Sequence, residues 1–184
     1  MLTVNSLSGF GSRAAFATVV IPGASDWMNV DSDLTFGTGT LDANGEGAGR
    51  TKATFTGDVE LQFTITREVN CGFGFYESGS GESLGGEDGT YSNANNQGSM
   101  TSMTDSWVYN GGDDSIYYGG SAKVTSVSWS GGDIAKISRI GSTFEMFKNG
   151  SSLHQFADTS ANEVRIVIGG GGGLTDLASI QWTI

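Results

Sequence analysis

The stretch DVELQFTIT, residues 58–66, decides the fold class. Its apolar residues alternate with polar ones, which puts Val59, Leu61, Phe63 and Ile65 on one face and Glu60, Gln62, Thr64 and Thr66 on the other. A period of two residues is the pattern of a β-strand with one buried and one solvated face. The stretch therefore predicts a strand whose sheet covers a core on one side and meets water on the other.

Similar short segments recur along the chain. They are rich in Val, Ile, Thr and aromatic residues and are separated by Gly, Asn and Asp, as is typical of strands joined by turns. No long stretch has a helical period. Further strands are predicted at residues 14–21, 50–56, 69–76, 106–109, 115–118, 123–129, 133–140, 143–148, 153–156, 163–168 and 177–184. In residues 123–129, Val124 is out of phase with Val127 and Trp129, which predicts a bulge or a strand buried on both faces.

Glycine marks the turns. The chain has 30 glycines and a single proline, Pro22. Asn149-Gly150 lies between two predicted strands and supplies the two positive-φ residues of a type I′ hairpin turn. The run Gly169–Gly173 either lets backbones approach closely or spans a gap flexibly.

Length and composition fit one domain. A chain of 184 residues buries roughly 70% of its unfolded surface, so it needs no disulfide or metal to form a core. Cys71 is the only cysteine and is expected to be a buried, inert thiol. We predict an N-terminal arm at residues 1–12, followed by a single β-sandwich domain at residues 13–184 with a long loop at residues 77–105.

The net charge of −11, from 20 acidic and 9 basic residues, excludes some partners. It opposes binding to a nucleic-acid backbone or to an anionic membrane. No apolar run approaches the ~20 residues of a membrane span, and residues 14–21 are interpreted as a strand rather than as part of a secretory signal. The charge serves solubility or forms a negative patch for a basic partner.

The C-terminal half carries a resemblance. It reads GDIAKISRIGSTFEMFKNGSSLHQF from Gly132 to Phe156, EVRIVIGGGGG from Glu163 to Gly173, and LASIQWTI up to Ile184. This order of strand, Asn-Gly hairpin, branched apolar strand, small-residue loop and closing strand resembles the concanavalin A-like lectin/glucanase family. The resemblance implies an all-β fold, a two-sheet antiparallel jelly-roll sandwich, with sugar-binding loops in many members.

The enzymatic branches of that family are not expected here. The glucanase branch carries three carboxylates of the form Glu-x-Asp-x-(x)-Glu on one strand. The nearest acidic stretch has Asp58, Glu60 and Glu68 at the wrong spacing. The alginate-lyase branch uses a Gln-Ile-His strand, whereas the only histidine, His154, follows an Asn-Gly turn, where an exposed or edge position is expected. We therefore predict no catalytic residues and no enzymatic activity.

Aromatic residues are densest at Trp107, Tyr109, Tyr117 and Tyr118. Trp107 and Tyr109 share one face of a predicted strand. A sandwich needs large residues inside, so core packing is one interpretation. The other is an exposed row formed by Trp107, Tyr109 and Tyr117 that stacks on sugar rings.

No metal or cofactor is predicted. Asp31 and Asp33 have a spacing that calcium loops use, but the glycine and the closing glutamate of an EF-hand are missing. Asp113-Asp114 is interpreted as a turn.

The N-terminal arm and the long loop suggest assembly contacts. Ordering the arm costs ~1–2 kcal/mol per residue in backbone entropy, more than its four apolar side chains recover in isolation. The loop is either solvated or ordered by a neighbouring molecule. The predicted contact residues are Leu2, Val4, Leu7 and Phe10 in the arm and Tyr91 in the loop.

These features lead to three hypotheses for function. SLSGFGSRAAFA near the N-terminus resembles the leaders of bacteriophage virion proteins. The first hypothesis is a structural virion protein, a capsid-decorating, cement or tail-associated subunit that contacts copies of itself or other capsid or tail subunits. The second is a carbohydrate-binding module or lectin with a glycan partner. A polysaccharide-cleaving enzyme comes third.

Overall fold

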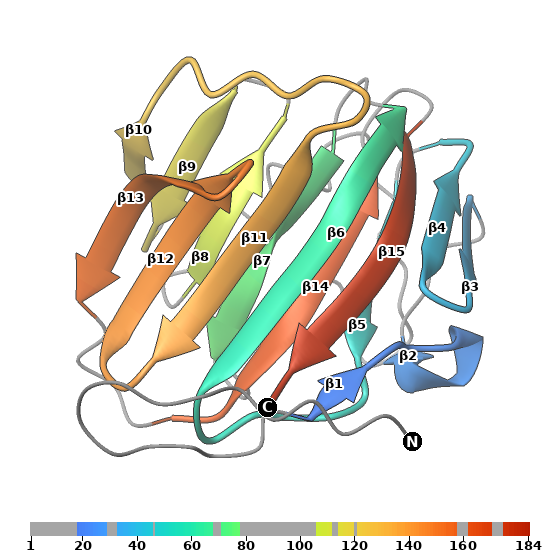
Figure 1. Cartoon of the computed structure of the whole chain (residues 1–184), viewed down its shortest axis with the longest axis horizontal. Helices are drawn as coiled ribbons and strands as arrows, with labels where there is room; N and C mark the ends of the chain where they lie inside the picture. Colours follow the sequence, from blue (N-terminus) through green and yellow to red (C-terminus); the bar gives the residue numbers. More distant parts are fainter. Residues whose placement is uncertain are drawn as a thin grey trace, which may run out of the picture.

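The structure is a computed structural model of the whole chain (Figure 1). It describes residues 18–28, 33–45, 47–67, 71–77, 106–111, 114–119, 121–157, 162–170 and 175–184. Within these ranges the chain is almost entirely β, the exception being a single 3-10 turn, Ala24–Asp26. No helix within these ranges could cross a membrane.

One sheet has eight strands and faces the viewer in Figure 1. Its order is β13-β12-β11-β6-β15-β4-β3, and β1 pairs with the end of β15. All these pairings are antiparallel. The strands are β1 (Val19–Val20), β3 (Leu34–Gly37), β4 (Thr40–Ala43), β6 (Val59–Arg67), β11 (Ile134–Ile140), β12 (Thr143–Lys148), β13 (Ser151–Ala157) and β15 (Thr175–Thr183).

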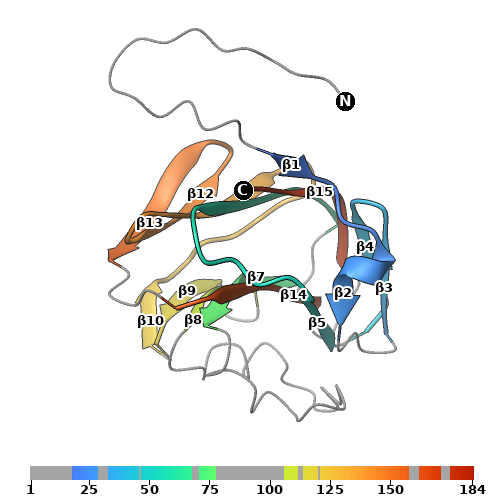
Figure 2. The same cartoon turned by 90° about the horizontal axis from the view of Figure 1, so that it is seen from below.

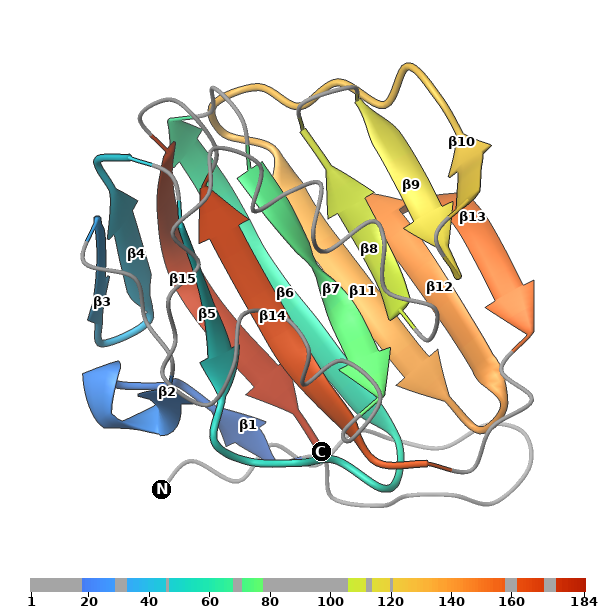
Figure 3. The same cartoon turned by 180° about the vertical axis from the view of Figure 1, so that it is seen from behind.

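The other sheet has seven strands in the order β10-β9-β8-β7-β14-β5-β2 (Figure 3). They are β2 (Trp27–Met28), β5 (Gly47–Thr51), β7 (Cys71–Glu77), β8 (Ser106–Asn110), β9 (Ser115–Tyr118), β10 (Ser121–Val124) and β14 (Val164–Gly170). The view in Figure 2 shows the two sheets as two facing layers. The predicted two-sheet antiparallel sandwich is therefore confirmed.

Aromatic side chains fill the space between the sheets. Phe63 of β6 meets Phe73 of β7 edge to face, with ring centroids 4.9 Å apart. Phe144 of β12 stacks on Trp107 of β8 at 3.7 Å. Contacts of this kind join inward-facing residues of both layers, as a sandwich core requires.

The strand predicted at residues 58–66 appears as β6, near the middle of the eight-stranded sheet. Its four apolar side chains are at most 1% exposed, whereas Glu60, Gln62 and Thr64 on the other face are half-buried. The period-two prediction is confirmed for this strand. Cys71 is also buried, as expected.

Two strands begin and end earlier than predicted, at residues 47–51 rather than 50–56 and at residues 121–124 rather than 123–129. The chain crosses between the sheets after each of them. β5 ends at Thr51, whose hydroxyl donates a hydrogen bond to the carbonyl oxygen of Ala53 (2.9 Å). β10 ends at Val124 after a register shift, and Ser126 then adopts a φ of 65°. Residues 125–133 lead from β10 to β11 across one end of the sandwich.

The structure tests the predictions made for the Asn149-Gly150 turn and for the glycine run that begins at Gly169. Asn149 and Gly150 adopt φ values of 52° and 80°, as the type I′ turn requires. Gly169 lies inside β14, where an added Cβ would be 2.5 Å from the carbonyl oxygen of Gly47. Close backbone approach is therefore the reason for glycine at position 169.

Candidate functional site

The predicted aromatic row is not a surface feature. Trp107 and Tyr109 are 2% and 0% exposed, and both point into the core. Tyr117 is half-buried on the opposite face of the same sheet, beside Tyr76 and Val108. The hypothesis that the three residues stack together on a sugar is wrong, because the alternation along β8 and β9 puts them on different faces.

Two other residues that the sequence singled out, His154 and Asp114, have contacts within the fold. His154 lies on the edge strand β13, half-buried, with its ring 4.5 Å from that of Phe156. Asp114 is in a turn with a φ of 53° and accepts a hydrogen bond from the Tyr109 hydroxyl (3.0 Å). Asp31 and the predicted contact residues Leu2, Val4, Leu7, Phe10 and Tyr91 lie outside the described residues. Within the described ranges, no three His, Cys, Asp or Glu side chains are grouped to hold a metal ion.

The outer faces of the two sheets differ in accessibility. On the seven-stranded sheet, Ala48, Tyr76, Val108 and Val167 form a cluster whose members are all 0% exposed. On the eight-stranded sheet, the outward-facing side chains of β6, β11 and β12 are mostly half-buried. The eight-stranded sheet therefore presents the accessible face.

Two rows of side chains cross this accessible face through the strand register. The first row runs Thr183, Glu60, Ser138, Glu145 and Gln155, from β15 to β13. The second row runs Gln181, Gln62, Lys136, Phe147 and Ser152 across the same five strands. We call these ten residues the polar platform.

Lys136 is at the centre of the platform. Its Nζ atom lies 3.0 Å from Oε2 of Glu60 and 4.3 Å from the ring centroid of Phe147. The Lys136 and Glu60 side chains are 27% and 32% exposed, so water screens the ion pair and its contribution to stability is small. Together, the ion pair and the contact between Lys136 and the Phe147 ring fix an ammonium group, a carboxylate and an aromatic ring at defined places on the surface.

The platform offers a specific set of interactions. Gln62, Gln155 and Gln181 present amides that both donate and accept hydrogen bonds. The hydroxyls of Thr183 and Ser152 and the two carboxylates add further acceptors, whereas Ser138 is buried. Phe147 provides an apolar ring face. This combination suits a ligand that has many hydroxyl groups and patches of C–H surface.

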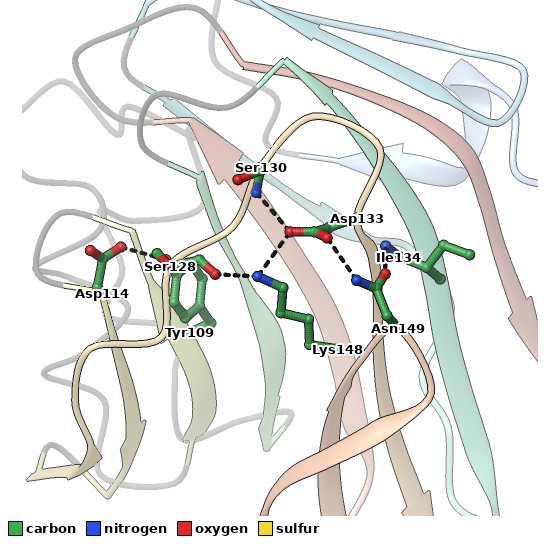
Figure 4. Close-up of polar contacts among 8 residues, drawn as sticks. All are labelled: Tyr109, Asp114, Ser128, Ser130, Asp133, Ile134, Lys148 and Asn149. Carbon is green, nitrogen blue, oxygen red and sulfur yellow. Dashed lines mark hydrogen bonds and ion pairs between the residues drawn. The ribbon is translucent and has the colours of Figure 1, made fainter.

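A polar network braces two platform strands at one end of the sandwich (Figure 4). Asn149, in the turn after β12, accepts a hydrogen bond from the backbone N–H of Ile134 at the start of β11 (2.8 Å). The Asn149 amide donates to Oδ1 of Asp133 (2.7 Å), and Lys148 Nζ lies 2.9 Å from Oδ2 of Asp133. The network therefore fixes the ends of β11 and β12 relative to each other.

The network also holds the segment that closes this end of the core. Lys148 donates to the carbonyl oxygen of Ser128 (2.7 Å) and lies 5.5 Å over the ring of Trp129. Trp129 is 3% exposed and meets the rings of Phe73 and Tyr109 edge to face. Residues 125–133 thus cover one end of the core between the two sheets.

The Asp133 carboxylate accepts hydrogen bonds from several members of the network, and these contacts shift its pKa. Burial raises its pKa, but hydrogen bonds from Asn149, Lys148 and the backbone N–H of Ser130, together with the charge of Lys148, outweigh that effect. The net pKa of Asp133 is below its ordinary value of 3.8.

Comparison with known proteins supports the fold and no more. Neither the family models nor the curated proteins give a match to this sequence. Among solved structures, the SPRY domain of human HERC1 has a TM-score of 0.56 at 16% identity, over 85% of this chain and 94% of that one. The carbohydrate recognition domain of Emp46p, in its metal-free form, has a TM-score of 0.55 at 8% identity, over 86% and 88%. The carbohydrate binding module CBM66 from Bacillus subtilis has a TM-score of 0.52 at 10% identity, over 85% and 94%.

The fold is a lectin-like jelly roll. It is of the concanavalin A-like type, as the resemblance of the C-terminal half implied, and it is shared by domains that are otherwise unlike one another in sequence. Fold alone does not give function.

Proposed function

We propose that this domain is a non-catalytic carbohydrate-recognition module whose glycan lies across the polar platform. The observation that carries the proposal is the accessible face on which Phe147 is surrounded by amide, hydroxyl and carboxylate groups at fixed register positions. A sugar ring has one hydroxylated edge and one C–H face, and the platform supplies partners for both. Two similar structures, Emp46p and CBM66, are described as carbohydrate-binding, which adds support.

The charge of the platform favours an uncharged glycan. Its ten residues include two carboxylates, Glu60 and Glu145, and one ammonium group, Lys136, which is paired with Glu60. The whole chain carries a net charge of −11. Both facts oppose the binding of sulfated or uronic-acid polymers by electrostatic repulsion.

Binding without cleavage is part of this proposal. Glu60 and Glu145 flank Ser138 on strands two positions apart, or roughly 9.6 Å between backbones at ~4.8 Å per strand. Inverting glycosidases hold their two carboxyl groups about 6.5–9.5 Å apart, so strand spacing alone does not exclude such a pair. However, Glu60 and its partner Lys136 are about one-third exposed, and catalysis of this kind relies on a site that excludes water.

Affinity electrophoresis tests the proposal. Gels that contain dextran, mannan, levan, laminarin, xylan or galactan should include at least one that retards the domain, whereas alginate and heparin gels should not. Phe147→Ala and Gln62→Ala should reduce the retardation, and Lys123→Ala, an exposed position on β10, should not. Release of reducing ends from the retarding polysaccharide would contradict binding without cleavage.

A structural role in a bacteriophage virion is the second proposal. Val19 and Ile21 are 55% and 61% exposed, and they lie seven and nine residues after the end of the N-terminal arm predicted to make assembly contacts. Exposed apolar side chains at one edge suit a contact with another copy or with a capsid or tail subunit in the virion. Light scattering of the intact chain tests this: oligomers that dissociate in the double variant Val19→Ser/Ile21→Ser would support it, and a monomer at high concentration would oppose self-association.

A further inference from the structure

We propose that a depression at one end of the polar platform binds the terminal residue of the glycan, so that the domain recognises chain ends. This inference rests on the proposed function and adds the part of the polysaccharide that is bound. It is carried by the lining of the depression, its position relative to the platform, and the hydrogen bonds that hold its shape.

The depression lies between the connection from β5 to β6 and the C-terminal residue. Its volume is about 490 Å³, and its lining residues are Thr54, Phe55, Thr56, Gly57, Asp58 and Ile184. Small-molecule sites have volumes of about 300–1,000 Å³ and combine an apolar lining with a few polar groups. Here Phe55 and Ile184 supply apolar surface, while two threonine hydroxyls and one carboxylate supply hydrogen-bonding groups.

The depression is continuous with the first row of the platform. Asp58 precedes Glu60 by two residues, and Ile184 directly follows Thr183. Glu60 and Thr183 are cross-strand partners at the start of that row. In Figure 1 the C-terminus lies beside the start of β6. The lining residues Asp58 and Ile184 therefore lie next to the start of the first row.

Backbone hydrogen bonds fix both walls. Phe55 and Val164 exchange two of them, at 2.9 and 3.0 Å, which ties the connection to β14. Ile184 and Thr18 exchange another two, at 2.9 and 3.1 Å, which anchors the C-terminal residue. A wall that is already ordered before binding loses little entropy when a ligand arrives.

Asp58 is the main polar group of the depression. Its Oδ1 atom accepts a hydrogen bond from the backbone N–H of Gly141 (2.8 Å), which orients the carboxylate. A carboxylate accepts through both oxygens, so a sugar hydroxyl can bind alongside this contact. Asp58→Asn keeps an acceptor for Gly141 and removes the charge.

The connection that lines the depression also limits the ligand. Residues 52–58 run from the seven-stranded sheet to the eight-stranded sheet and supply five of the six lining residues. Under this proposal the terminal sugar of a glycan that extends along the platform meets this connection. A sugar in the middle of the chain is linked on both sides, so the polysaccharide would have to continue past this connection.

The test compares chain ends with chain mass. The probe is the neutral polysaccharide that retards the domain in the gel panel, together with a partial acid hydrolysate of the same material. If ends are bound, inhibition per unit mass rises in proportion to their number, about tenfold for chains about tenfold shorter. Asp58→Asn, checked for an unchanged melting temperature, should lower the potency of the hydrolysate to that of the intact polymer, and Lys123→Ala should not.

The outcomes separate this inference from the proposed function. Equal potency of polymer and hydrolysate overturns end recognition and leaves platform binding in place. An unchanged preference in Asp58→Asn overturns the assignment to this depression. If no polysaccharide in the panel retards the domain, the platform proposal fails and this inference fails with it.

Discussion

Lys136 and Glu60 form an ion pair on the accessible face of the eight-stranded sheet, with Nζ and Oε2 3.0 Å apart. The two residues are 76 positions apart in the chain and lie on the neighbouring strands β11 and β6. In the same place Lys136 covers the ring of Phe147. The pair thus links the two rows of the platform.

Lys136→Ala should separate binding from stability. An exposed pair contributes about 0–1 kcal/mol, so the free energy of unfolding in urea should change by no more than that. Glycan binding should weaken severalfold, because the variant loses the ammonium donor and releases Glu60 from its fixed position. The matched control is Lys123→Ala on β10, which removes a lysine outside the platform. Equal binding by the two variants would exclude Lys136 from the site.

The low pKa of Asp133 predicts a pH dependence of stability. Because the folded protein holds this proton more weakly than the unfolded chain, Asp133 stabilises the fold above its ordinary pKa of 3.8. That contribution is lost as the pH falls through the lower folded value. Urea unfolding of wild type and Asp133→Asn from about pH 6 to pH 2 should therefore show a shallower decline in the variant. Asp42→Asn, at an exposed position on β4, is the control.

The core position of Trp107 predicts a large loss of stability when the ring is removed. Trp107→Ala removes a ring stacked on Phe144 and should cost about 3–5 kcal/mol of unfolding free energy. Trp107→Phe should cost less, since the indole N–H has no hydrogen-bond partner among the described residues. Binding by the folded Trp107→Phe protein should equal that of wild type. A selective loss of binding would restore the sugar-stacking hypothesis.

Residues 58–66 show which features of the platform are encoded in local sequence. Alternation predicted β6 and identified Glu60 and Gln62 as its solvated face. It could not identify their neighbours, because register with Lys136 and Gln181 depends on strand order rather than on local pattern. The platform was therefore missed, although part of it lay in the first strand recognised.

The same limit explains why the sequence left two interpretations of Trp107 open, of which core packing is confirmed. The pattern of β8 shows that Trp107 and Tyr109 share a face, but it does not say whether that face meets the core or solvent, because that depends on how the two sheets pack. β3 and β4 were missed because each is only four residues long and contains a turn-forming residue, Gly37 or Asp42. Such strands are recognised only by their pairing.

Gly74 offers a sharp test of the sheet geometry. A Cβ at this position would lie 2.7 Å from the Cα of Val108 and still closer to the carbonyl oxygen of Trp107. Gly74→Ala should therefore force β7 and β8 apart and lower the melting temperature strongly. At Gly57 an added Cβ meets nothing within 4 Å, so Gly57→Ala should leave stability nearly unchanged. Similar melting temperatures for the two variants would show that β7 and β8 are not this close.

Phe147→Ala is the direct test of the platform. The ring is half-buried on an outer face, so its removal should cost far less stability than the loss of a core aromatic. A sugar that stacks on the ring would lose about 1–1.5 kcal/mol, or roughly five- to tenfold in affinity. Isothermal titration with the retarding polysaccharide measures this change. Ile21→Ala removes an exposed apolar side chain elsewhere and should bind like wild type. Unchanged affinity in Phe147→Ala would place the glycan away from this face.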